Sequence, residues 1–402
     1  MSKDAKNVPA LRFKGYSDAW EKRKLGDVVE RVTRKNRDLV STRPLTISAQ
    51  DVLVDQRNFF SKTVASKNIS NYFLLKAGDF AYNKSYSVGY PWGAVKRLDK
   101  YPSGVLSTLY IVFKPKKINS QFLVTYFEGT TWYVSVSKVA SEGARNHGLL
   151  NISASDFFDQ QLFFPTKKTE QESIGLTIKV LDDLIAATQH KIDALEQVKE
   201  TLSKNLFDQL WRFKEYSTSW KENKLKDIVS AYSGGTPSAN IRTYYGGHIP
   251  FIRSAEIHSS TTALTLTQEG LKNSSAKLVK TGDILYALYG ANSGDVDRSK
   301  INGAINQAIL AMRPSKENDS NFILFQLMRM KNKIVSTYLQ GGQGNLSGRI
   351  ILALNLDMPE STSEQRTIGR SLQLLCELIS INQSKYSQLE SLKKSLLQNL
   401  FV

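Results

Sequence analysis

The chain carries the same opening twice, and this repeat limits what it can fold into. Residues 11–29 read LRFKGYSDAWEKRKLGDVV and residues 211–229 read WRFKEYSTSWKENKLKDIV, with ten of nineteen positions identical at an offset of 200. A second repeat joins residues 165–207 to residues 359–401, with 17 of 43 positions identical at an offset of 194 and no gap. Such self-similarity indicates a tandem duplication, so the fold must contain two related halves.

Each copy of the second repeat predicts one long helix. Both begin with a proline followed by a predicted capping box, Thr169 with Glu172 and Ser361 with Glu364, and neither contains a later proline. Apolar residues then recur at gaps of 4, 3, 4, 7, 3, 7 and 4, which is the spacing of a heptad seam. The seam residues are Ile174, Ile178, Leu181, Ile185, Ile192, Leu195, Leu202 and Leu206, and then Ile368, Leu372, Leu375, Ile379, Tyr386, Leu389, Leu396 and Leu400.

These helices are too long to bury their apolar stripes in one small domain, because ~40 residues extend ~60 Å. We therefore predict that the two stripes pack on each other as an antiparallel coiled coil, which would relate the two globular halves by a pseudo-two-fold axis. Polar pairs interrupt the seam, Thr188 with Asn382 and Lys199 with Lys393, and these would set the register or face a further partner. The alternative is that each stripe packs on its own globular domain.

The positive charge is concentrated in the segments outside the helices. The net charge is +17, with a surplus of +11 in residues 1–165 and +7 in residues 211–358, whereas residues 166–210 carry −2 and residues 359–402 carry +1. A local basic excess is typical of nucleic-acid binding, although a basic surface without such a partner is the alternative. We predict domains over residues 1–165 and 211–358 and helical spacers over residues 166–210 and 359–402.

Both basic segments read as α+β domains. LLKAGDFAY (74–82) matches LVKTGDILY (278–286), and Gly-Asp between apolar runs predicts a turn that leads into a strand. HIPFIRSAEI (248–257) and GDILYALYG (282–290) are rich in strand-forming residues, and residues 321–340 predict a helix.

Motifs of an enzyme are absent. No glycine-rich loop ends in Gly-Lys-Ser/Thr, GGQGNLSG (341–348) lacks that lysine, and no Asn-Pro-Pro-aromatic or Asp-Pro-Pro-aromatic motif of amino-methylating enzymes occurs. Four histidines and one cysteine show no metal-ligand spacing, and Ser274 with Lys277 matches a nucleophile pair by spacing alone. We therefore expect a binding protein without catalytic residues, metal or cofactor.

Cysteine usage and hydropathy suggest a compartment. The sole cysteine, Cys376, excludes an intrachain disulfide. No apolar run is long enough to span a bilayer, and the first thirty residues lack the apolar core of a secretion signal. We expect a cytoplasmic protein.

The paired repeats with EQxxIG and NLF, together with SGGTPSANIRTYYGGHIPFIRSAEI, LVKTGDILYALYGANSGD and INQAILAMRP in the second half, resemble the specificity subunits of type I restriction–modification systems. The resemblance covers nearly the whole chain, but residues 32–63 of the first half lack the Gly-Gly-Thr-Pro signature. It implies two target-recognition domains that read one half each of a split, asymmetric DNA sequence. The implied partners are double-stranded DNA, two modification (methyltransferase) subunits and ATP-dependent restriction subunits.

In such a domain, Lys and Arg neutralise phosphates while polar and Arg side chains on loops read base edges. The candidate DNA-binding residues of the second domain are Thr236, Ser238, Arg242, Tyr244, Arg253, Ser254, Tyr289, Asn292 and Ser293. Those of the first domain are Arg57, Lys62, Lys67, Lys84, Tyr86, Arg97 and Arg145.

Two other functions stay open at this point. A self-contained nuclease or methyltransferase would show cleavage or methyl transfer by the purified chain. A structural or RNA-binding coiled-coil adaptor would bind polyanions with a salt dependence but without a large ratio of specific to non-specific affinity.

Overall fold

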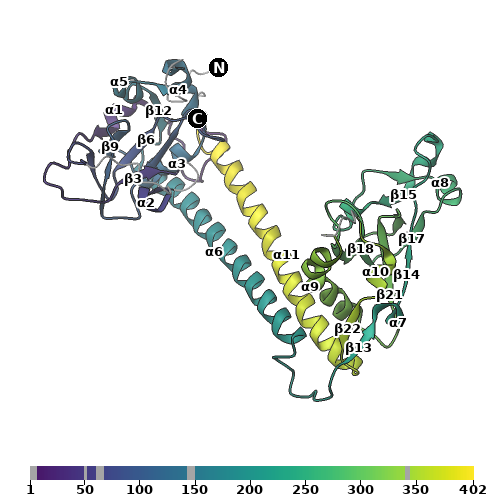
Figure 1. Ribbon diagram of the computed structural model, residues 1–402. Helices are drawn as coiled ribbons and strands as arrows, with labels where there is room; N and C mark the ends of the chain where they lie inside the picture. Colours follow the sequence, from purple (N-terminus) through teal and green to yellow (C-terminus); the bar gives the residue numbers. More distant parts are fainter. Residues whose placement is uncertain (1–6, 49–51, 60–67, 143–149, 340–344) are drawn as a thin grey trace. The chain divides into compact units, whose positions relative to one another are not determined.

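The computed structural model describes residues 7–48, 52–59, 68–142, 150–339 and 345–402. It divides into two compact units, which we call unit 1 (residues 1–189 and 384–402) and unit 2 (residues 190–383). Each unit contains parts of both long helices, α6 (Lys168–Phe207) and α11 (Thr362–Asn399), beside an α+β domain (Figure 1). The predicted α+β class and both predicted long helices are confirmed.

Unit 1 is built on a four-stranded antiparallel sheet in the order β2-β9-β6-β7, with strand pairs β1-β12, β3-β4, β5-β8 and β10-β11. Short helices cover its core. The bounds of its strands are β1 (Glu21–Lys24), β2 (Val29–Arg31), β3 (Leu45–Ile47), β4 (Leu53–Asp55), β5 (Phe73–Lys76), β6 (Phe80–Asn83), β7 (Ala94–Arg97), β8 (Ser103–Leu106), β9 (Ile111–Pro115), β10 (Ser141–Glu142), β11 (Leu150–Asn151) and β12 (Gln161–Phe164). Its short helices are α1 (Leu25–Val28), α2 (Gln56–Phe59), α3 (Ser120–Glu128), α4 (Tyr133–Val139) and α5 (Ala154–Phe158).

Unit 2 repeats this sheet as β14-β21-β18-β19. Its second sheet, β16-β15-β20-β17, in which β15 and β20 run parallel, corresponds to the pairs β4-β3 and β8-β5 of unit 1, which a parallel bridge between Pro44 and Val105 joins. The strand pair β13-β22 repeats β1-β12. Its strands are β13 (Lys221–Lys224), β14 (Val229–Ser233), β15 (Tyr245–Ile252), β16 (Thr265–Leu266), β17 (Lys277–Val279), β18 (Ile284–Ala287), β19 (Val296–Arg298), β20 (Gly303–Ile305), β21 (Ile309–Pro314) and β22 (Asn355–Met358). Its helices are α7 (Leu225–Ile228), η2 (Arg242–Tyr244), η3 (Ser254–Glu256), α8 (Gln268–Lys272), α9 (Ser320–Tyr338) and α10 (Gly348–Leu352).

The Gly-Asp turns enter strands as predicted. Gly78 and Gly282 adopt φ of 88° and 96°, in the left-handed region that favours glycine. The carboxylate of Asp79 accepts a hydrogen bond from the backbone N–H of Lys76, and Asp283 accepts the equivalent bond from Lys280, both at 2.8 Å. The same turn therefore begins β6 in unit 1 and β18 in unit 2.

The repeated opening docks onto the start of a long helix in each unit. In unit 1 the guanidinium of Arg12 donates two hydrogen bonds, at 2.7 and 2.9 Å, to the carboxylate of Glu170, and the indole N–H of Trp20 donates a third at 3.3 Å. In unit 2, Arg212 donates to Glu364 at 2.8 and 2.9 Å and Trp220 donates at 3.1 Å. Both carboxylate side chains are only 2% exposed. We call this arrangement the Arg–Glu–Trp clasp.

The glutamine and glycine that follow each clasp glutamate fix the next contact. The side-chain carbonyl of Gln171 accepts from the backbone N–H of Asn119, the N-cap residue of α3, and its amide donates to the carbonyl of Pro165. Gln365 makes the equivalent bonds to Asp319, the N-cap residue of α9, and to Pro359. A Cβ atom at Gly175 would lie 2.9 Å from backbone atoms of α3, and one at Gly369 would lie 2.5 Å from the Asp319 carboxylate. The EQxxIG motif therefore seats each long helix against a shorter helix.

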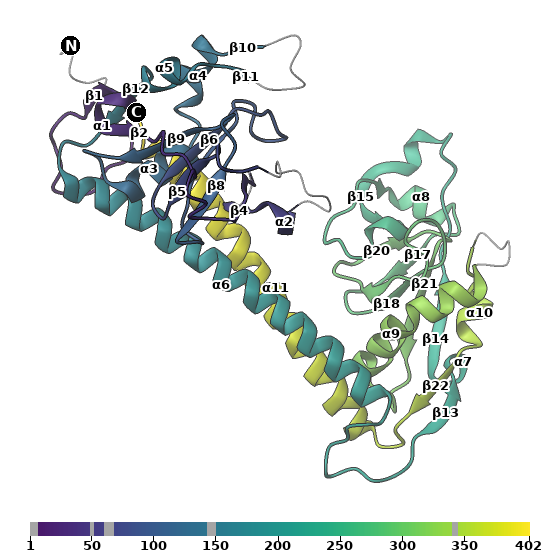
Figure 2. The same cartoon turned by 60° about the vertical axis from the view of Figure 1, so that its left-hand side comes forward.

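The long helices pair antiparallel within each unit, as predicted, and they lie side by side in both views (Figures 1 and 2). In unit 1 the start of α6, with Ile174 and Ile178, shares a core with Leu400 and Phe401 after the end of α11. In unit 2 the end of α6, with Leu206 and Phe207, shares a core with the start of α11. The seam residues are buried or half-buried, and the polar groups of buried Thr188 and Asn382 donate to carbonyls of their own helices at 2.7 Å.

The capping-box prediction is only partly right. The hydroxyl of Ser361 accepts from the backbone N–H of Glu364 at 3.4 Å, but the Glu364 carboxylate is engaged in the clasp. Helix α6 begins at Lys168, so Thr169 lies inside its first turn and does not cap it. The residue at the position of Ser361 is Lys167, which has no hydroxyl. Thr169 with Glu172 is therefore a local match without the predicted role.

The seam lysines, Lys393 in unit 1 and Lys199 in unit 2, have different neighbouring side chains. In unit 1 the ammonium of Lys393 lies 3.1 Å from the carboxylate of Glu128 and 2.5 Å from that of Asp182, beside a cleft of about 320 Å³. In unit 2 the equivalent residues are Lys199, Met328 and Cys376, and they line a cleft of about 650 Å³. The duplication therefore keeps the cleft and the lysine but exchanges both acids for less polar side chains.

Among the described residues, no helix is both long enough and apolar enough to cross a membrane.

We predict that Glu364→Ala lowers the free energy of unfolding by about 3 kcal/mol, because it leaves the Arg212 guanidinium and the Trp220 indole without their acceptor. Chemical denaturation followed by tryptophan fluorescence measures the change. The control is Asp183→Ala, which removes the exposed pair with Lys179 and should cost no more than about 0.5 kcal/mol. Equal losses of unfolding free energy from the two variants would show that the clasp stabilises the fold no more than an exposed ion pair does.

A second prediction concerns pH. Burial raises the pKa of Glu128 above its usual value of 4.5, and the approach of Lys393 only partly offsets this. A carboxyl group with a raised pKa in the folded state stabilises the fold at low pH, and this stabilisation is lost as the pH rises through the raised value. Glu128→Gln should therefore gain in Tm relative to the unaltered chain as the pH is increased from about 4.5. A Tm difference that stays constant across this range would contradict the prediction.

Candidate nucleic-acid interface

The Gly-Gly-Thr-Pro segment of unit 2 packs tightly against the sheet β16-β15-β20-β17. A Cβ atom at Gly234 would lie 1.8 Å from the carbonyl oxygen of Ile305, and one at Gly235 would lie 2.5 Å from the side chain of Ser275. The hydroxyl of Thr236 donates to the side-chain carbonyl of Gln307 at 2.7 Å. The Pro237 carbonyl accepts from the hydroxyl of Tyr245 at 2.6 Å. The segment needs both glycines because the backbone of β20 and residue 275 approach so closely.

This tightly packed segment presents a polar loop to solvent. Ser238 and Arg242 are exposed, whereas Tyr244 is half-buried and its carbonyl accepts from the backbone N–H of Thr267 at 3.0 Å. Within the described part of the chain, the guanidinium of Arg242 has no hydrogen-bond or ion-pair partner. Its charge is therefore available to an anion outside the protein, as a phosphate contact requires.

Arg253 and Ser254 follow β15 at the start of η3. Arg253 is 44% exposed, but its guanidinium forms two hydrogen bonds, at 3.0 and 3.2 Å, to the carboxylate of Glu256. Burial acts to raise the pKa of Glu256, but the bonds from Arg253 and from the backbone of Ala263 outweigh it and lower the pKa. Ser254 is half-buried. A DNA phosphate would have to compete with Glu256 for Arg253.

Tyr289, Asn292 and Ser293 lie in the turn between β18 and β19. The hydroxyl of Ser293 is buried and donates to the carbonyl of Gly290 at 2.8 Å, while the Asn292 amide donates to Asp295 at 3.2 Å. Tyr289 packs against the core of unit 2. The described contacts of these three residues therefore shape the turn.

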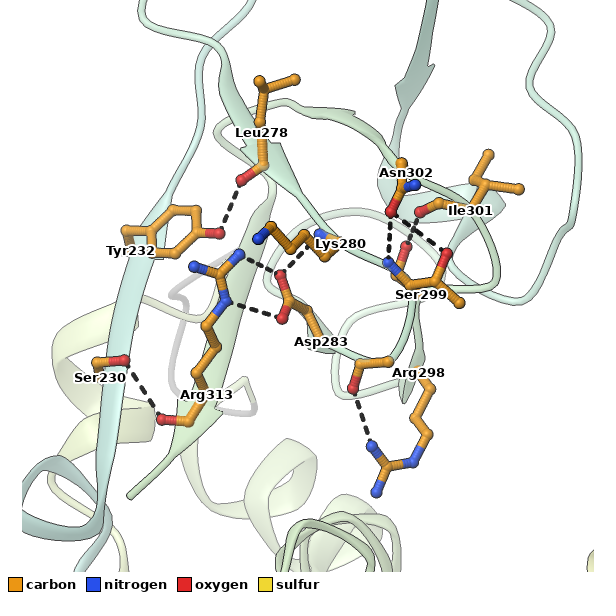
Figure 3. A network of polar contacts seen from close by, with 12 residues as sticks. Ser230, Tyr232, Leu278, Lys280, Asp283, Arg298, Ser299, Ile301, Asn302 and Arg313 are labelled. Atoms are coloured by element: carbon orange, nitrogen blue, oxygen red, sulfur yellow. Dashed lines mark hydrogen bonds and ion pairs between the residues drawn. The ribbon is translucent and has the colours of Figure 1, made fainter. Parts of the chain in front are cut away.

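A polar network surrounds the turn that leads into β18 (Figure 3). The carboxylate of Asp283 accepts two hydrogen bonds from Arg313, at 2.8 and 2.6 Å, and Tyr232, whose ring lies 5.5 Å from that guanidinium, donates to the carbonyl of Leu278 at 2.8 Å. The side-chain carbonyl of Asn302 accepts a hydrogen bond from the backbone N–H of Thr281 at 2.9 Å. Burial acts to raise the pKa of Asp283, but the bonds from Arg313 and Lys280 lower it. The network ties β14, β21 and the entry to β18 together.

Four of the seven candidates in unit 1 lie in the described part of the chain; Lys62, Lys67 and Arg145 lie outside it. The guanidinium of Arg57 bonds the Asp55 carboxylate at 3.0 and 2.6 Å. Lys84 donates to the carbonyl of Ile152 at 3.3 Å. Tyr86 is 59% exposed in the loop after β6. Of the four, Tyr86 alone presents a largely exposed side chain without a partner among the described residues.

Arg97 joins β7 to the start of α3. Its guanidinium donates to Ser120 at 2.9 Å and to Gln121 at 2.8 Å. Arg298 of unit 2 bonds Asn321, the counterpart of Gln121, at 2.7 Å. A bond that recurs in both units supports a structural role for Arg97, and its contact with DNA stays a prediction.

The structure brings Thr236, Ser238, Arg242 and Tyr244 together on one loop, and Tyr289, Asn292 and Ser293 together on one turn. The anchor Gln307 was not among the predicted residues, although it lies in the quoted INQAILAMRP segment. Within the described ranges, no group of three or more His, Cys, Asp or Glu is arranged to hold a metal ion.

Comparisons with known proteins find the same resemblance to type I specificity subunits that the sequence motifs indicate. Residues 218–391 match the family model described as Type I restriction modification DNA specificity domain. The chain is 22% identical to the putative type I restriction enzyme MjaX specificity subunit of Methanocaldococcus jannaschii, over 95% of this chain and 92% of that protein. It is 21% identical to the type I restriction enzyme MjaVIII specificity subunit of the same organism, over 90% of this chain and 83% of that protein.

Solved structures show the same fold. A crystal structure of a type I restriction–modification S subunit from M. genitalium aligns with a TM-score of 0.66 at 16% identity, covering 98% of this chain and 99% of that one. The fold and the matched domain define a two-unit protein of the DNA-specificity class. Residues 218–391 belong to the family of type I restriction–modification DNA specificity domains, and the chain is similar over nearly its whole length to specificity subunits of type I systems.

We predict that Arg97→Ala mainly lowers stability, whereas Arg242→Ala mainly weakens DNA binding. Arg97→Ala should lower the free energy of unfolding by about 1–2 kcal/mol, because it removes the bonds to α3. Arg242→Ala should change it by less than about 0.5 kcal/mol, since the side chain is exposed, while weakening DNA binding. Denaturation and fluorescence anisotropy on both variants decide the matter, and a destabilised Arg242→Ala would assign that residue to the scaffold instead.

Proposed function

We propose that this specificity subunit reads a bipartite, asymmetric DNA target, with one half recognised by each unit. The observation that carries the proposal is the repeated frame with different loops on it. The clasp, the EQxxIG contact, the Gly-Asp turn and the strand pairing of both sheets recur in the two units, whereas the Gly-Gly-Thr-Pro loop, in which Thr236 bonds Gln307, occurs in the sequence of unit 2 and not in that of unit 1. Two different readers on one kind of frame suit two different half-sites.

The recognition domains would be residues 1–165 and 211–358, and residues 166–210 and 359–402 would be helical spacers between the half-sites. The repeated helices offer equivalent surfaces to two modification subunits, and ATP-dependent restriction subunits would join that complex. The related structures include one titled as the basis of complex assembly and conformational transition of the type I R-M system, with a TM-score of 0.52. The chain itself would contribute no catalytic residue, metal or cofactor, and it would act in the cytoplasm, where the chromosomal target lies.

Positive side chains would hold the phosphate backbone, and the polar loops would contact base edges in the major groove. Arg242 is the best supported phosphate or base contact, because it is exposed and unpaired within the described residues. Two further candidate side chains are exposed, Ser238 in unit 2 and Tyr86 in unit 1. The target adenine would leave the base stack and enter the active site of the modification subunit.

The test is methylation mapping of DNA from cells that express this chain with its cognate modification subunit. We expect a bipartite methylated motif that disappears when the chain is deleted. Exchange of residues 30–150 for those of another specificity subunit should alter one half of the motif and leave the other half unchanged.

The alternatives give different results. A motif that does not depend on the chain, together with DNA binding by the purified complex, would favour a non-specific adaptor. Methyl transfer or cleavage by the purified chain alone would show that it is itself an enzyme.

A further inference from the structure

A cleft of about 510 Å³ in unit 2 is lined by three cations, Lys224, Lys226 and Arg349, above Leu352 and Ala353. Lys224 ends β13, Lys226 belongs to α7 and Arg349 belongs to α10, three elements that lie close together in Figure 1. The pairing of β13 with β22 and the packing of α7 on α10 bring the side chains together. None of the residues that line the cleft is acidic.

The three cations are free to bind an anion. All three residues are exposed, and none of their side chains has a hydrogen-bond or ion-pair partner within the described ranges. Of the nearby acids, Asp227 is exposed on α7 but does not line the cleft, and the Glu222 carboxylate accepts from the amide of Asn355. Three like charges around one cleft repel each other unless an anion neutralises them.

Unit 1 offers an internal comparison, because β1, α1 and α5 repeat β13, α7 and α10. There the ammonium of Lys24 lies 2.8 Å from the carboxylate of Asp159, and Ala353 occupies that position in unit 2. Gly26 replaces Lys226, and a Cβ atom at Gly26 would lie 3.3 Å from that of Phe158. Ser155 replaces Arg349. The same site is thus neutralised internally in unit 1 and open in unit 2.

We propose that this cleft binds a phosphate group of the DNA backbone, outside the recognition loops and in unit 2 alone. Ammonium groups bind phosphate as point charges, and a guanidinium adds two parallel hydrogen bonds. An acidic protein surface would also suit the charge. DNA is favoured because all three cations belong to residues 218–391, the matched DNA specificity domain. The inference rests on the proposed function and adds a sequence-independent contact to it.

The test measures the salt dependence of DNA binding by the full chain in complex with its modification subunits. Fluorescence anisotropy would use one duplex that carries the mapped motif and one scrambled duplex. Each phosphate contact contributes about 0.9 to the slope of log K against log salt. Because the cleft binds one phosphate group, Lys226→Gln with Arg349→Gln should reduce the slope by up to about 0.9 on both duplexes. Ala353→Asp supplies the acid found in unit 1, so it should also reduce the slope by up to about 0.9, because the new carboxylate pairs with Lys224 and repels the phosphate.

The matched control is Lys24→Gln, whose ammonium is already paired with Asp159, and it should leave the slope unchanged. The substituted residues are exposed, so an unchanged Tm confirms that each variant is folded. If the unaltered complex prefers its motif but the cleft variants keep its slope, or Lys24→Gln lowers the slope equally, the cleft proposal is overturned and the proposed function stands. If the unaltered complex shows no preference for the motif, the proposed function fails.

Discussion

The buried carboxylate at the start of each long helix is the constraint on which the rest of the structure depends. A carboxylate removed from water is costly unless charged and polar groups replace its hydration. Glu170 and Glu364 receive these groups from Arg and Trp residues about 150 positions earlier in the chain. Any unit that uses such a helix therefore needs its own copy of the opening segment, and this requirement accounts for the opening that occurs twice.

The duplication conserves contacts rather than charges, and the seam lysines show the difference. Lys393 is neutralised by Glu128 and Asp182, whereas Lys199 faces Met328 and Cys376 at the equivalent positions. The Gly-Asp turns diverge in the same way. Asp79 takes its arginine from residue 34 after β2, and Asp283 takes its arginine from residue 313 in β21. The two units therefore keep the same backbone contacts while the neighbours of their charged side chains differ, and the shared frame can carry different loops for the same reason.

The long helices and their pairing could be predicted from the sequence because heptad spacing is a local and periodic signal. The cap at Thr169 could not, because a hydroxyl followed by a glutamate also occurs one turn inside a helix. The candidate site was harder still. The sequence predicts the same DNA-binding role for Arg97 and Arg242, yet the Arg97 side chain bonds α3 and the Arg242 side chain is exposed to solvent. The partner of a charge depends on contacts between distant segments, which spacing along the chain does not encode.

A net charge of +17 thus says less about an interface than the local balance of ion pairs does. Arg57 and Arg253 both count toward that surplus, but each is held by an acid two or three residues away. A cation committed to an internal acid releases no counterion from DNA when the duplex binds, and so contributes little to affinity. The duplicated frame makes this distinction visible within one chain. A cation that is paired with an acid in one unit and lacks that acid in the other, such as Lys24 and Lys224, marks a surface in the second unit where an external anion can take the place of the acid.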